Sequence, residues 1–216
     1  MMNMQYKISI IHPSRNRLEQ AEETIKLWLD NAKDKSSIDY TLSVDIDDKY
    51  LKRYKALSDK YGTNIHIAKN NSAIEAINRA TRRSKGNIII VVSDDFNCEP
   101  NWDEKLSKEL EGKEDFIVKT QDGLQEWIIT LPIMDRKYYE RFGYVYYPKY
   151  QHLFSDTEMT SVADLTGRKI TSQLFFEHRH YSTGKSEKDA VNTKNDSTWN
   201  QGKKLYNQRK AINFGL

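Results

Sequence analysis

The sequence is short of cysteine and of long apolar runs, and each shortage excludes a class of protein. Its one cysteine, Cys98, cannot form an intrachain disulfide framework or a cysteine-rich zinc site. No hydrophobic stretch approaches the ~20 residues of a membrane-spanning helix. Residues 1–13 also lack the apolar region and cleavage site of a signal peptide. We therefore expect a soluble cytoplasmic protein.

Net charge is also nearly absent, at +3 over 216 residues, and identifies no partner. The charge is unevenly distributed, because the segment from Arg179 to the end has eight Lys or Arg against three Asp or Glu. Such a basic segment could contact phosphates, a membrane surface or nucleic acid, and an ordinary solvated surface explains it equally well. The apolar content of 38 % and aromatic content of 11 % are sufficient for a folded core.

The first half of the chain alternates between strand and helix patterns. Apolar residues three and four positions apart predict amphipathic helices, whereas short apolar runs predict strands. The expected strands are 6–13, 40–48, 64–69 and 87–93, and the expected helices are 17–32, 49–62 and 72–85, the last ended by Gly86. This order predicts an α/β fold in which helices sandwich a largely parallel sheet.

Polar residues lie at the carboxyl ends of three of these strands, where ligands of open parallel sheets bind. They are His12 to Arg15, Asp45 to Asp48, and Ser93-Asp94-Asp95. Two adjacent carboxylates at the end of a buried strand repel each other unless a divalent cation neutralises them. Mg²⁺ and Mn²⁺ prefer carboxylate oxygens and keep positions open for substrate phosphates. We therefore predict a Mn²⁺ or Mg²⁺ site at this edge.

The stretch "NNSAIEAINRATRRSKGNIIIVVSDDFNCEPNWDEKL" (70–106) resembles the nucleotide-sugar-binding half of GT-A fold, family 2 glycosyltransferases. An Asn- and Ala-rich helix leads there through a Gly and an apolar strand to an Asp-x-Asp metal motif. The resemblance extends over residues 6–178. It implies a Rossmann-like sandwich with a central, mostly parallel sheet and a C-terminal acceptor region. The division expected is a domain over 1–181 (nucleotide-binding half 1–98, acceptor half 99–181) and a polar basic loop or tail over 182–216.

The resemblance also implies contacts in the nucleotide-binding half. Asp45 matches the aspartate that hydrogen-bonds uracil, Asp95 the principal metal ligand, and Asp94 the carboxylate facing the donor sugar or ribose. The other nucleotide-binding candidates are Pro13, Ser14, Arg15, Asp47, Asn71 and Arg79. Ser93 replaces the first Asp of the Asp-x-Asp motif, so we expect weaker metal binding or a metal held through water.

In the acceptor half, "FSDTEMTSVADLTGRKI" (154–170) resembles the segment that carries the catalytic base of inverting members. Asp156 is the candidate base and Glu158 its substitute, although the same residues could simply cap a helix. The resemblance further implies that His178 or His180 completes the metal site. Candidates near the donor sugar and acceptor are Asp122, Gly123 and Trp127, in a segment that otherwise reads as a hairpin turn. The six tyrosines between Tyr138 and Tyr150 could pack in the core or stack on a substrate.

Taken together, the resemblance implies metal-dependent transfer of a hexosyl group from a nucleotide sugar, such as a UDP-sugar, to an acceptor hydroxyl with inversion. The acceptor would be a glycan or, as in compact members encoded by phages and acting in the host cytoplasm, a hydroxymethylated DNA base. No protein partner is identifiable. A nucleotidyltransferase is one alternative, disfavoured because the N-terminus has no Gly-rich phosphate loop. A sugar- or nucleic-acid-binding module with a degenerate metal site is another, favoured by Ser93.

Overall fold

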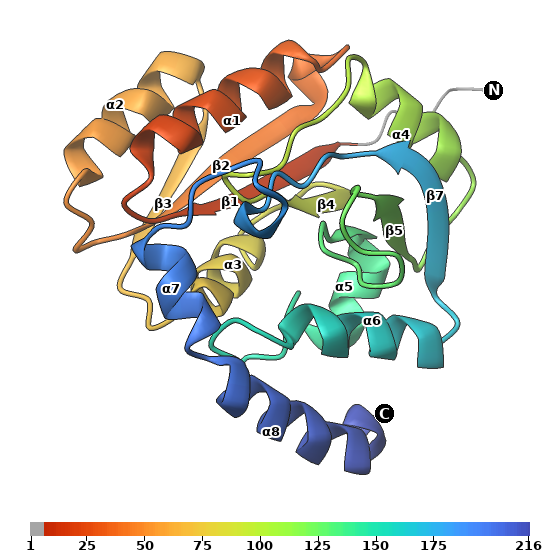
Figure 1. Cartoon of the computed structure of the whole chain (residues 1–216). Helices are drawn as coiled ribbons and strands as arrows, with labels where there is room; N and C mark the ends of the chain where they lie inside the picture. Colours follow the sequence, from red (N-terminus) through yellow and green to blue (C-terminus); the bar gives the residue numbers. More distant parts are fainter. Residues whose placement is uncertain (1–6) are drawn as a thin grey trace.

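The computed structural model describes residues 7–216, and its core is one seven-stranded sheet (Figure 1). The strand order is β3-β2-β1-β4-β6-β5-β7, with β6 antiparallel to both of its neighbours. The strands are β1 (Ile8–Ser14), β2 (Ile38–Asp45), β3 (Asn64–Ala68), β4 (Ile88–Val91), β5 (Ile117–Gln121), β6 (Ile133–Asp135) and β7 (Lys169–Phe175). The predicted α/β fold with a mostly parallel sheet is confirmed. Residue 6, with which we began the first strand, lies outside the described residues.

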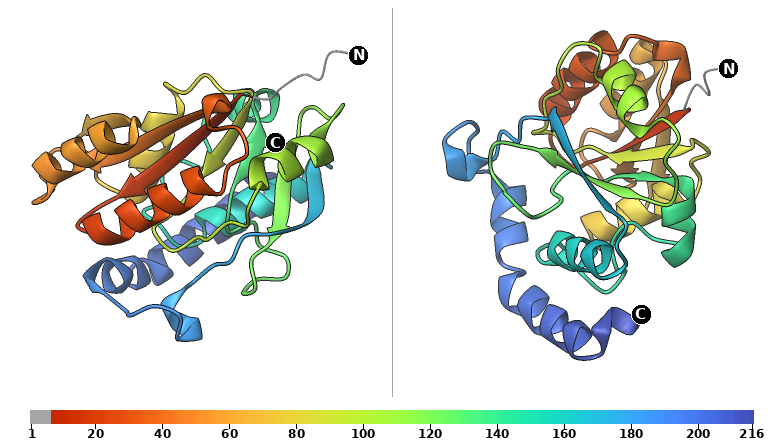
Figure 2. Two further views of the ribbon diagram at one scale, coloured as in Figure 1. Left: turned by 90° about the horizontal axis from the view of Figure 1, so that it is seen from above. Right: turned by 90° about the vertical axis from the view of Figure 1, so that its right-hand side faces the viewer.

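Helices cover both faces of this sheet, as Figures 1 and 2 show. The apolar cluster on one face contains side chains of α1, α2 and α4, and that on the other contains side chains of α3, α5 and α6. The helices are α1 (Leu18–Asp30), α2 (Leu51–Tyr61), α3 (Ala73–Thr81), α4 (Trp102–Leu110), α5 (Arg136–Phe142), α6 (Ser155–Leu165), α7 (Ala190–Asp196) and α8 (Trp199–Ala211). No helix within residues 7–216 is long and apolar enough to cross a membrane.

The connection after β4 is fixed by two buried tryptophans. Trp28 Nε1 donates to the carbonyl of Phe96 at 2.9 Å, and Trp102 Nε1 donates to the carbonyl of Trp28 at 3.0 Å. The Trp28 ring also stacks on Phe176, with centroids 5.5 Å apart. Because buried indole N–H groups need a partner, these bonds tie the segment after β4 to α1 and hold Asp94 and Asp95 in place.

Gly86 has a different role from the one we expected. Helix α3 ends at Thr81, so Gly86 does not terminate it. A Cβ atom at Gly86 would lie 2.6 Å from the backbone nitrogen of Ser9 and 2.7 Å from the carbonyl oxygen of Lys7. The backbone before β4 can therefore approach β1 only where there is no side chain.

We expect Gly86→Ala to lower the free energy of unfolding by about 2 kcal/mol, because the added methyl meets backbone that can relieve the clash only by shifting β1 or β4. Urea unfolding measures the change. Lys85→Ala, at the exposed neighbouring position, should stay within about 0.5 kcal/mol of the unsubstituted chain. Equal stability of the two variants would show that β1 and β4 do not need this close approach.

Residues 182–216, which we expected to be a loop or tail, contain regular secondary structure. They form α7 and α8, and α8 lies on the outside of α6 (Figures 1 and 2). The polar and basic sequence did not predict these helices, because Gly202 is the one residue of α8 that is buried and the helix shows no apolar stripe. The helices are held to the domain by ion pairs, Arg17 with Asp189 and Glu158 with Arg209.

Candidate functional site

The polar clusters at the ends of β1 and β4 meet, and Asp94, which we expected to face the donor sugar or ribose, is hydrogen-bonded to residues of β1. His12 Nε2 lies 2.8 Å from Asp94 Oδ1, and Ser14 Oγ donates to Asp94 Oδ2 at 3.2 Å. His12 is itself held by Tyr40, whose hydroxyl lies 2.8 Å from Nδ1. The Asp94 side chain is only 6 % exposed. Both of its carboxylate oxygens are thus bound within the protein, and Asp94 braces the ends of β1 and β4.

Asp95, the second carboxylate after β4, is the candidate metal ligand. Ser93 Oγ donates to its Oδ1 at 2.6 Å, and His178 Nε2 lies 3.3 Å from its Oδ2. Burial alone would raise the pKa of the Asp95 carboxyl, but the hydrogen bonds from His178 and Ser93 bring it to about 2. Asp95 is therefore ionised throughout the physiological range. Ser93, which departs from the Asp-x-Asp pattern, orients this carboxylate.

The backbone explains why a histidine so late in the sequence reaches Asp95. The segment after β7 lies between the β4 and β5 connections: the amide of Arg179 donates to the carbonyl of Asp95 at 2.8 Å, and the amide of His178 donates to the carbonyl of Asp122 at 2.9 Å. The His178 ring stacks on Phe96 with centroids 4.3 Å apart. His180, the other candidate, turns its Nδ1 to Ser182 Oγ at 2.7 Å.

The fit of a metal depends on what completes its coordination. Within residues 7–216, no group of three or more His, Cys, Asp or Glu side chains is arranged to hold a metal ion. Asp95 and His178 alone face each other, and His178 Nδ1 is buried without a hydrogen-bond partner among the described residues. Mg²⁺ and Mn²⁺ commonly bind through one or two protein groups, with substrate phosphates and water filling the other positions. The pair fits a cation of this kind, and does not fit a closed structural metal site.

The ends of β1, β2 and β3 form a second polar group. The Arg15 guanidinium bonds to both Asp45 and Asp47, at 3.0 and 3.2 Å for the Asp47 oxygens, and these hydrogen bonds raise its pKa. Asn70 Nδ2 donates to Asp45 Oδ1 at 2.7 Å, while Asn70 Oδ1 is buried without a partner in the described chain. A buried, unpaired amide oxygen is costly, and it is available here for a ligand N–H.

Asn70, which we had not selected, is thus beside Asp45, whereas the predicted Asn71 is not. The Asn71 side chain donates to Glu75 at 2.9 Å, and Arg79 pairs with the same carboxylate and donates to the carbonyl of Lys69 at 2.9 Å. The pairing register of β2 with β3 explains this difference. It places Asp45 opposite Ala68, two residues before Asn70. Pro13 lies within β1 opposite Ser43, and Ser14 bonds to Tyr54 and Asp94.

Arg17 is a further residue at this edge that the sequence reasoning missed. Its Nε and Nη2 donate to the two oxygens of Asp189 at 2.6 and 2.8 Å, and its side chain is only 15 % exposed. Burial lowers the pKa of Arg17, but the Asp189 hydrogen bond and the charges of Asp94 and Asp95 raise it overall. The charges of Asp94 and Asp95 therefore stabilise the Arg17 guanidinium. Its ion pair with Asp189 joins the start of α7 to the start of α1.

Asp156 lies in the first turn of α6 with one carboxylate oxygen available. Its Oδ1 accepts from the backbone nitrogen of Thr157 at 2.7 Å, and no residue of 7–216 hydrogen-bonds its Oδ2. Loss of solvent on burial raises the pKa of this carboxyl. The N-cap residue of α6 is Phe154, which makes no side-chain capping hydrogen bond, and Asp156 binds a first-turn amide from within the helix through one oxygen only. A carboxylate with a raised pKa and a free oxygen is suited to general-base chemistry.

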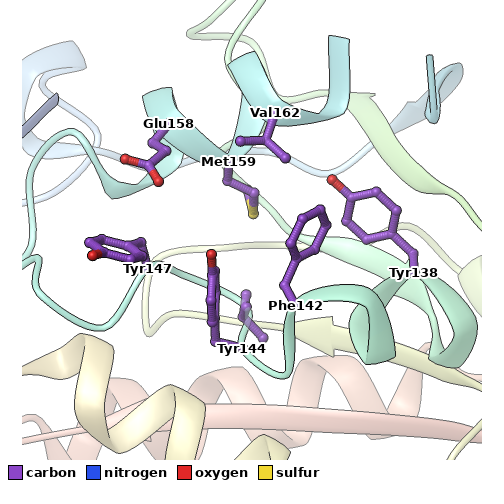
Figure 3. A pocket seen from close by; sticks show the side chains of 8 residues that line it. Tyr138, Phe142, Tyr144, Tyr147, Glu158, Met159 and Val162 are labelled. Atoms are coloured by element: carbon purple, nitrogen blue, oxygen red, sulfur yellow. The ribbon is translucent and has the colours of Figure 1, made fainter. Parts of the chain in front are cut away.

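Glu158, the substitute base, is fully engaged elsewhere. Its Oε2 accepts from the Tyr150 hydroxyl at 2.8 Å, and its Oε1 accepts from Arg209 Nε and Nη2 at 3.0 and 2.9 Å. Figure 3 shows Glu158 at the rim of a pocket whose other labelled side chains are Tyr138, Phe142, Tyr144, Tyr147, Met159 and Val162. Glu158 therefore fastens α8 to α6. Of the six tyrosines, Tyr138, Tyr139, Tyr146 and Tyr150 are buried in the core.

The loop between β5 and β6 contains the remaining candidates. Asp122 is buried and accepts from the backbone nitrogens of Leu124 and Gln125 at 2.8 and 2.7 Å. Gly123 has a φ of 74°, in the left-handed region that favours glycine. Asp122 and Gly123 thus shape the loop, and Trp127 is the large side chain that the loop leaves half exposed.

Comparisons with known proteins agree with this architecture. A family model described as glycosyl transferase family 2 matches residues 9–153. Among solved structures, mannosyltransferase PcManGT from Pyrobaculum calidifontis, in complex with GDP-Man and Mn²⁺, superposes with a TM-score of 0.64 at 13 % identity, over 81 % of this chain and 57 % of that one.

S. aureus TarS gives a TM-score of 0.66 at 11 % identity, over 80 % of this chain and 36 % of TarS. Its 1–349 form in complex with UDP gives 0.62 at 12 % identity, over 79 % of this chain and 60 % of that one. The chain therefore spans less than two thirds of the length of these structures. No curated protein matches the sequence significantly. The family match covers most of the chain, and the resemblance seen in the sequence is confirmed: the chain belongs to glycosyl transferase family 2 and has the GT-A fold.

Proposed function

We propose that the chain transfers a hexosyl group from a UDP-sugar to an acceptor hydroxyl with inversion at the sugar C1. The observation that supports the proposal is that the chain contains two carboxylates with different surroundings, Asp95 and Asp156, whose charges both act on His152. One of them faces a histidine and suits a cation; the other has a raised pKa and a free oxygen. A transferase needs this division between a leaving-group side and an acceptor side.

The chain's own residues have separate tasks in this reaction. Asp45 and Asn70 receive N–H groups of the nucleobase, and Asp95 with His178 would hold the cation. That cation, Mn²⁺ or Mg²⁺, supplies positive charge that offsets the charge developing on the leaving diphosphate. Asp156 removes the proton of the acceptor hydroxyl while its oxygen attacks C1 from the side opposite the diphosphate. The C1–O bond breaks, and its electron pair leaves with the diphosphate.

The similar structures support a nucleotide-sugar donor. One of them contains GDP-Man and Mn²⁺, and TarS structures contain UDP or UDP-GlcNAc. We propose the UDP donor because Asp45 matches, in the sequence resemblance, the aspartate that hydrogen-bonds uracil. The acceptor we propose is a glycan, with a hydroxymethylated DNA base as the class to test beside it. Nucleotidyl transfer is the less suitable reaction, since it does not require Asp156.

We expect the chain to bind UDP more tightly than GDP, and at least tenfold more tightly with Mn²⁺ than without it, a difference of about 1.4 kcal/mol or more. Asp95→Ala should abolish the effect of Mn²⁺ because it removes the charged ligand. Calorimetric titration of the full chain measures both. Glu99→Ala, which removes an exposed carboxylate four residues away, is the matched control and should bind as the unsubstituted chain does. Absence of nucleotide binding under all these conditions would contradict the proposed function.

A further inference from the structure

The backbone around His152, in the loop before α6, is held from several directions. The His152 carbonyl accepts from Ser155 Oγ at 2.7 Å and from the Ser155 amide at 3.3 Å. The amide of the next residue, Leu153, donates to Thr198 Oγ1 at 3.2 Å. A Cβ atom at Gly202 of α8 would overlap the Leu153 carbonyl oxygen. Contacts from α6 and α8 therefore fix the position of the His152 backbone.

The turn that follows His152 is strained. Phe154 has a φ of 72°, in the left-handed region that a residue with a bulky side chain rarely adopts. Its ring packs edge-on against Trp199 at 5.0 Å, so tertiary packing compensates for the cost. Strain of this kind persists where surrounding structure enforces it, and it is common at functional sites. Here the left-handed Phe154 lies between His152 and α6, whose first turn contains Asp156.

The His152 ring has an unexplained feature. Its Nδ1 is buried and has no hydrogen-bond partner among residues 7–216. Leaving a buried polar nitrogen unpaired is costly, so this nitrogen is available to bind a proton. A histidine that only fills space would be replaced by an apolar side chain without loss.

The charged groups around the ring come from four parts of the fold. Burial lowers the pKa of His152; Asp156 on α6, Asp95 after β4 and Asp196 at the end of α7 act to raise it, and Arg17 before α1 acts to lower it. Burial has the largest effect, so the imidazole is neutral at neutral pH and able to accept a proton. Asp156 is first among the carboxylates that favour the protonated form.

We propose that His152 is a positioning residue that acts through Asp156, by receiving on Nδ1 the proton that Asp156 takes from the acceptor hydroxyl. This inference rests on the proposed function. The acceptor O–H bond breaks and its proton moves to Asp156; the acceptor oxygen bonds to C1 as the diphosphate leaves. The proton then passes from Asp156 to His152, which restores the carboxylate, and the imidazolium loses it to water.

The His152–Asp156 hydrogen bond is not made in this structure, where Asp156 Oδ1 is bound to Thr157 instead. Hydrogen bonds between catalytic groups are often long without substrate and tighten when it binds. A pair of this kind titrates as a unit, so its protonation steps belong to both groups.

The first test needs neither donor nor acceptor. The imidazole signals of the full-length chain are followed by NMR as a function of pH, and His152 is assigned from the signal that His152→Gln lacks. We expect the pKa of His152 to fall in Asp156→Asn, because the imidazolium loses the negative charge that stabilises it most. An unchanged pKa overturns the inference.

The second test measures hydrolysis of a UDP-sugar, with water as acceptor, in the presence of Mn²⁺. We expect His152→Gln to lower kcat about tenfold with unchanged UDP binding, and the acid limb of its pH profile to move to lower pH because His152 no longer titrates. His66→Gln, at a histidine of β3 that contacts Arg83, is the control and should leave kcat within twofold. Thermal unfolding and UDP binding establish that each variant is folded.

The outcomes separate the inference from the function on which it rests. Equal kcat and an equal acid limb in His152→Gln and in the unsubstituted chain overturn the proton transfer to His152 alone. Absence of turnover in the unsubstituted chain with every UDP-sugar overturns the proposed function, and this inference with it. Loss of UDP binding in His152→Gln would give the residue a structural role and likewise overturn the inference.

Discussion

Asp156→Asn should reduce the rate of sugar transfer about 10³-fold, equivalent to about 4 kcal/mol of transition-state stabilisation. The amide has nearly the same shape as the carboxylate, but it cannot accept a proton from the acceptor hydroxyl. Because we propose that Asp156 acts on the acceptor, binding of UDP and Mn²⁺ should stay within twofold of the unsubstituted chain. The expected signature is thus a loss of kcat without a loss of donor affinity.

Release of UDP from a panel of UDP-sugars measures this effect, with water or an added acceptor. Asp164→Asn is the matched control, because it makes the same change on the same helix at a carboxylate that only pairs with Lys169, at 2.5 Å. It should leave turnover within twofold. If Asp156→Asn retained more than a third of the turnover, Asp156 would not be the base, and the acceptor side of the site would need another carboxylate.

The order of the elements was predictable because it depends on local periodicity. The alternation of strands and helices to β4, and the clustering of polar residues at the carboxyl ends of β1, β2 and β4, follow from patterns that short stretches of sequence contain. The hairpin interpretation of Asp122-Gly123 implied antiparallel strands on either side of it, but the place of β6 between β4 and β5 and the helices α7 and α8 were not predicted. β6 is only three residues long, and α8 is polar on most of its surface.

The roles of individual carboxylates were harder to predict, because partners distant in sequence decide them. Asp94 and Asp95 are adjacent and chemically identical, yet His12 and Ser14 turn Asp94 inward while His178 meets Asp95. That difference depends on the pairing of β4 with β1 in the sheet. A local sequence pattern does not predict which strands pair.

Asn70 and His152 were missed for related reasons. We selected Asn71, the next residue along the chain, but its side chain donates to the carboxylate of Glu75 in the first turn of α3. His152 stands alone in a tyrosine-rich loop, where no sequence pattern marks it. The charges of Asp156, Asp95 and Arg17 act on it only when the segments before α1, after β4 and before α6 converge.

Glu158→Ala should be the most destabilising of these substitutions, lowering the free energy of unfolding by about 3–5 kcal/mol. Glu158 and Arg209 form an ion pair whose side chains are only 3 % and 12 % exposed. Removing the carboxylate leaves a buried guanidinium without its charge partner, and also leaves the Tyr150 hydroxyl without its acceptor. Urea unfolding measures the loss, with Glu140→Ala, at an exposed position on α5, expected within about 0.5 kcal/mol.

Replacing both members of the pair distinguishes a buried charge from a general loss of packing. In Glu158→Leu/Arg209→Leu no charge stays buried, so we expect most of the stability lost in Glu158→Ala to return. UDP and Mn²⁺ binding should persist in both variants, since Glu158 faces α8 rather than Asp95. A double variant no more stable than Glu158→Ala would show that packing around the Tyr147 ring, over which the Arg209 guanidinium lies at 3.8 Å, holds α8 in place. In that case the contact between Arg209 and the aromatic ring would stabilise the C-terminal helix more than the ion pair does.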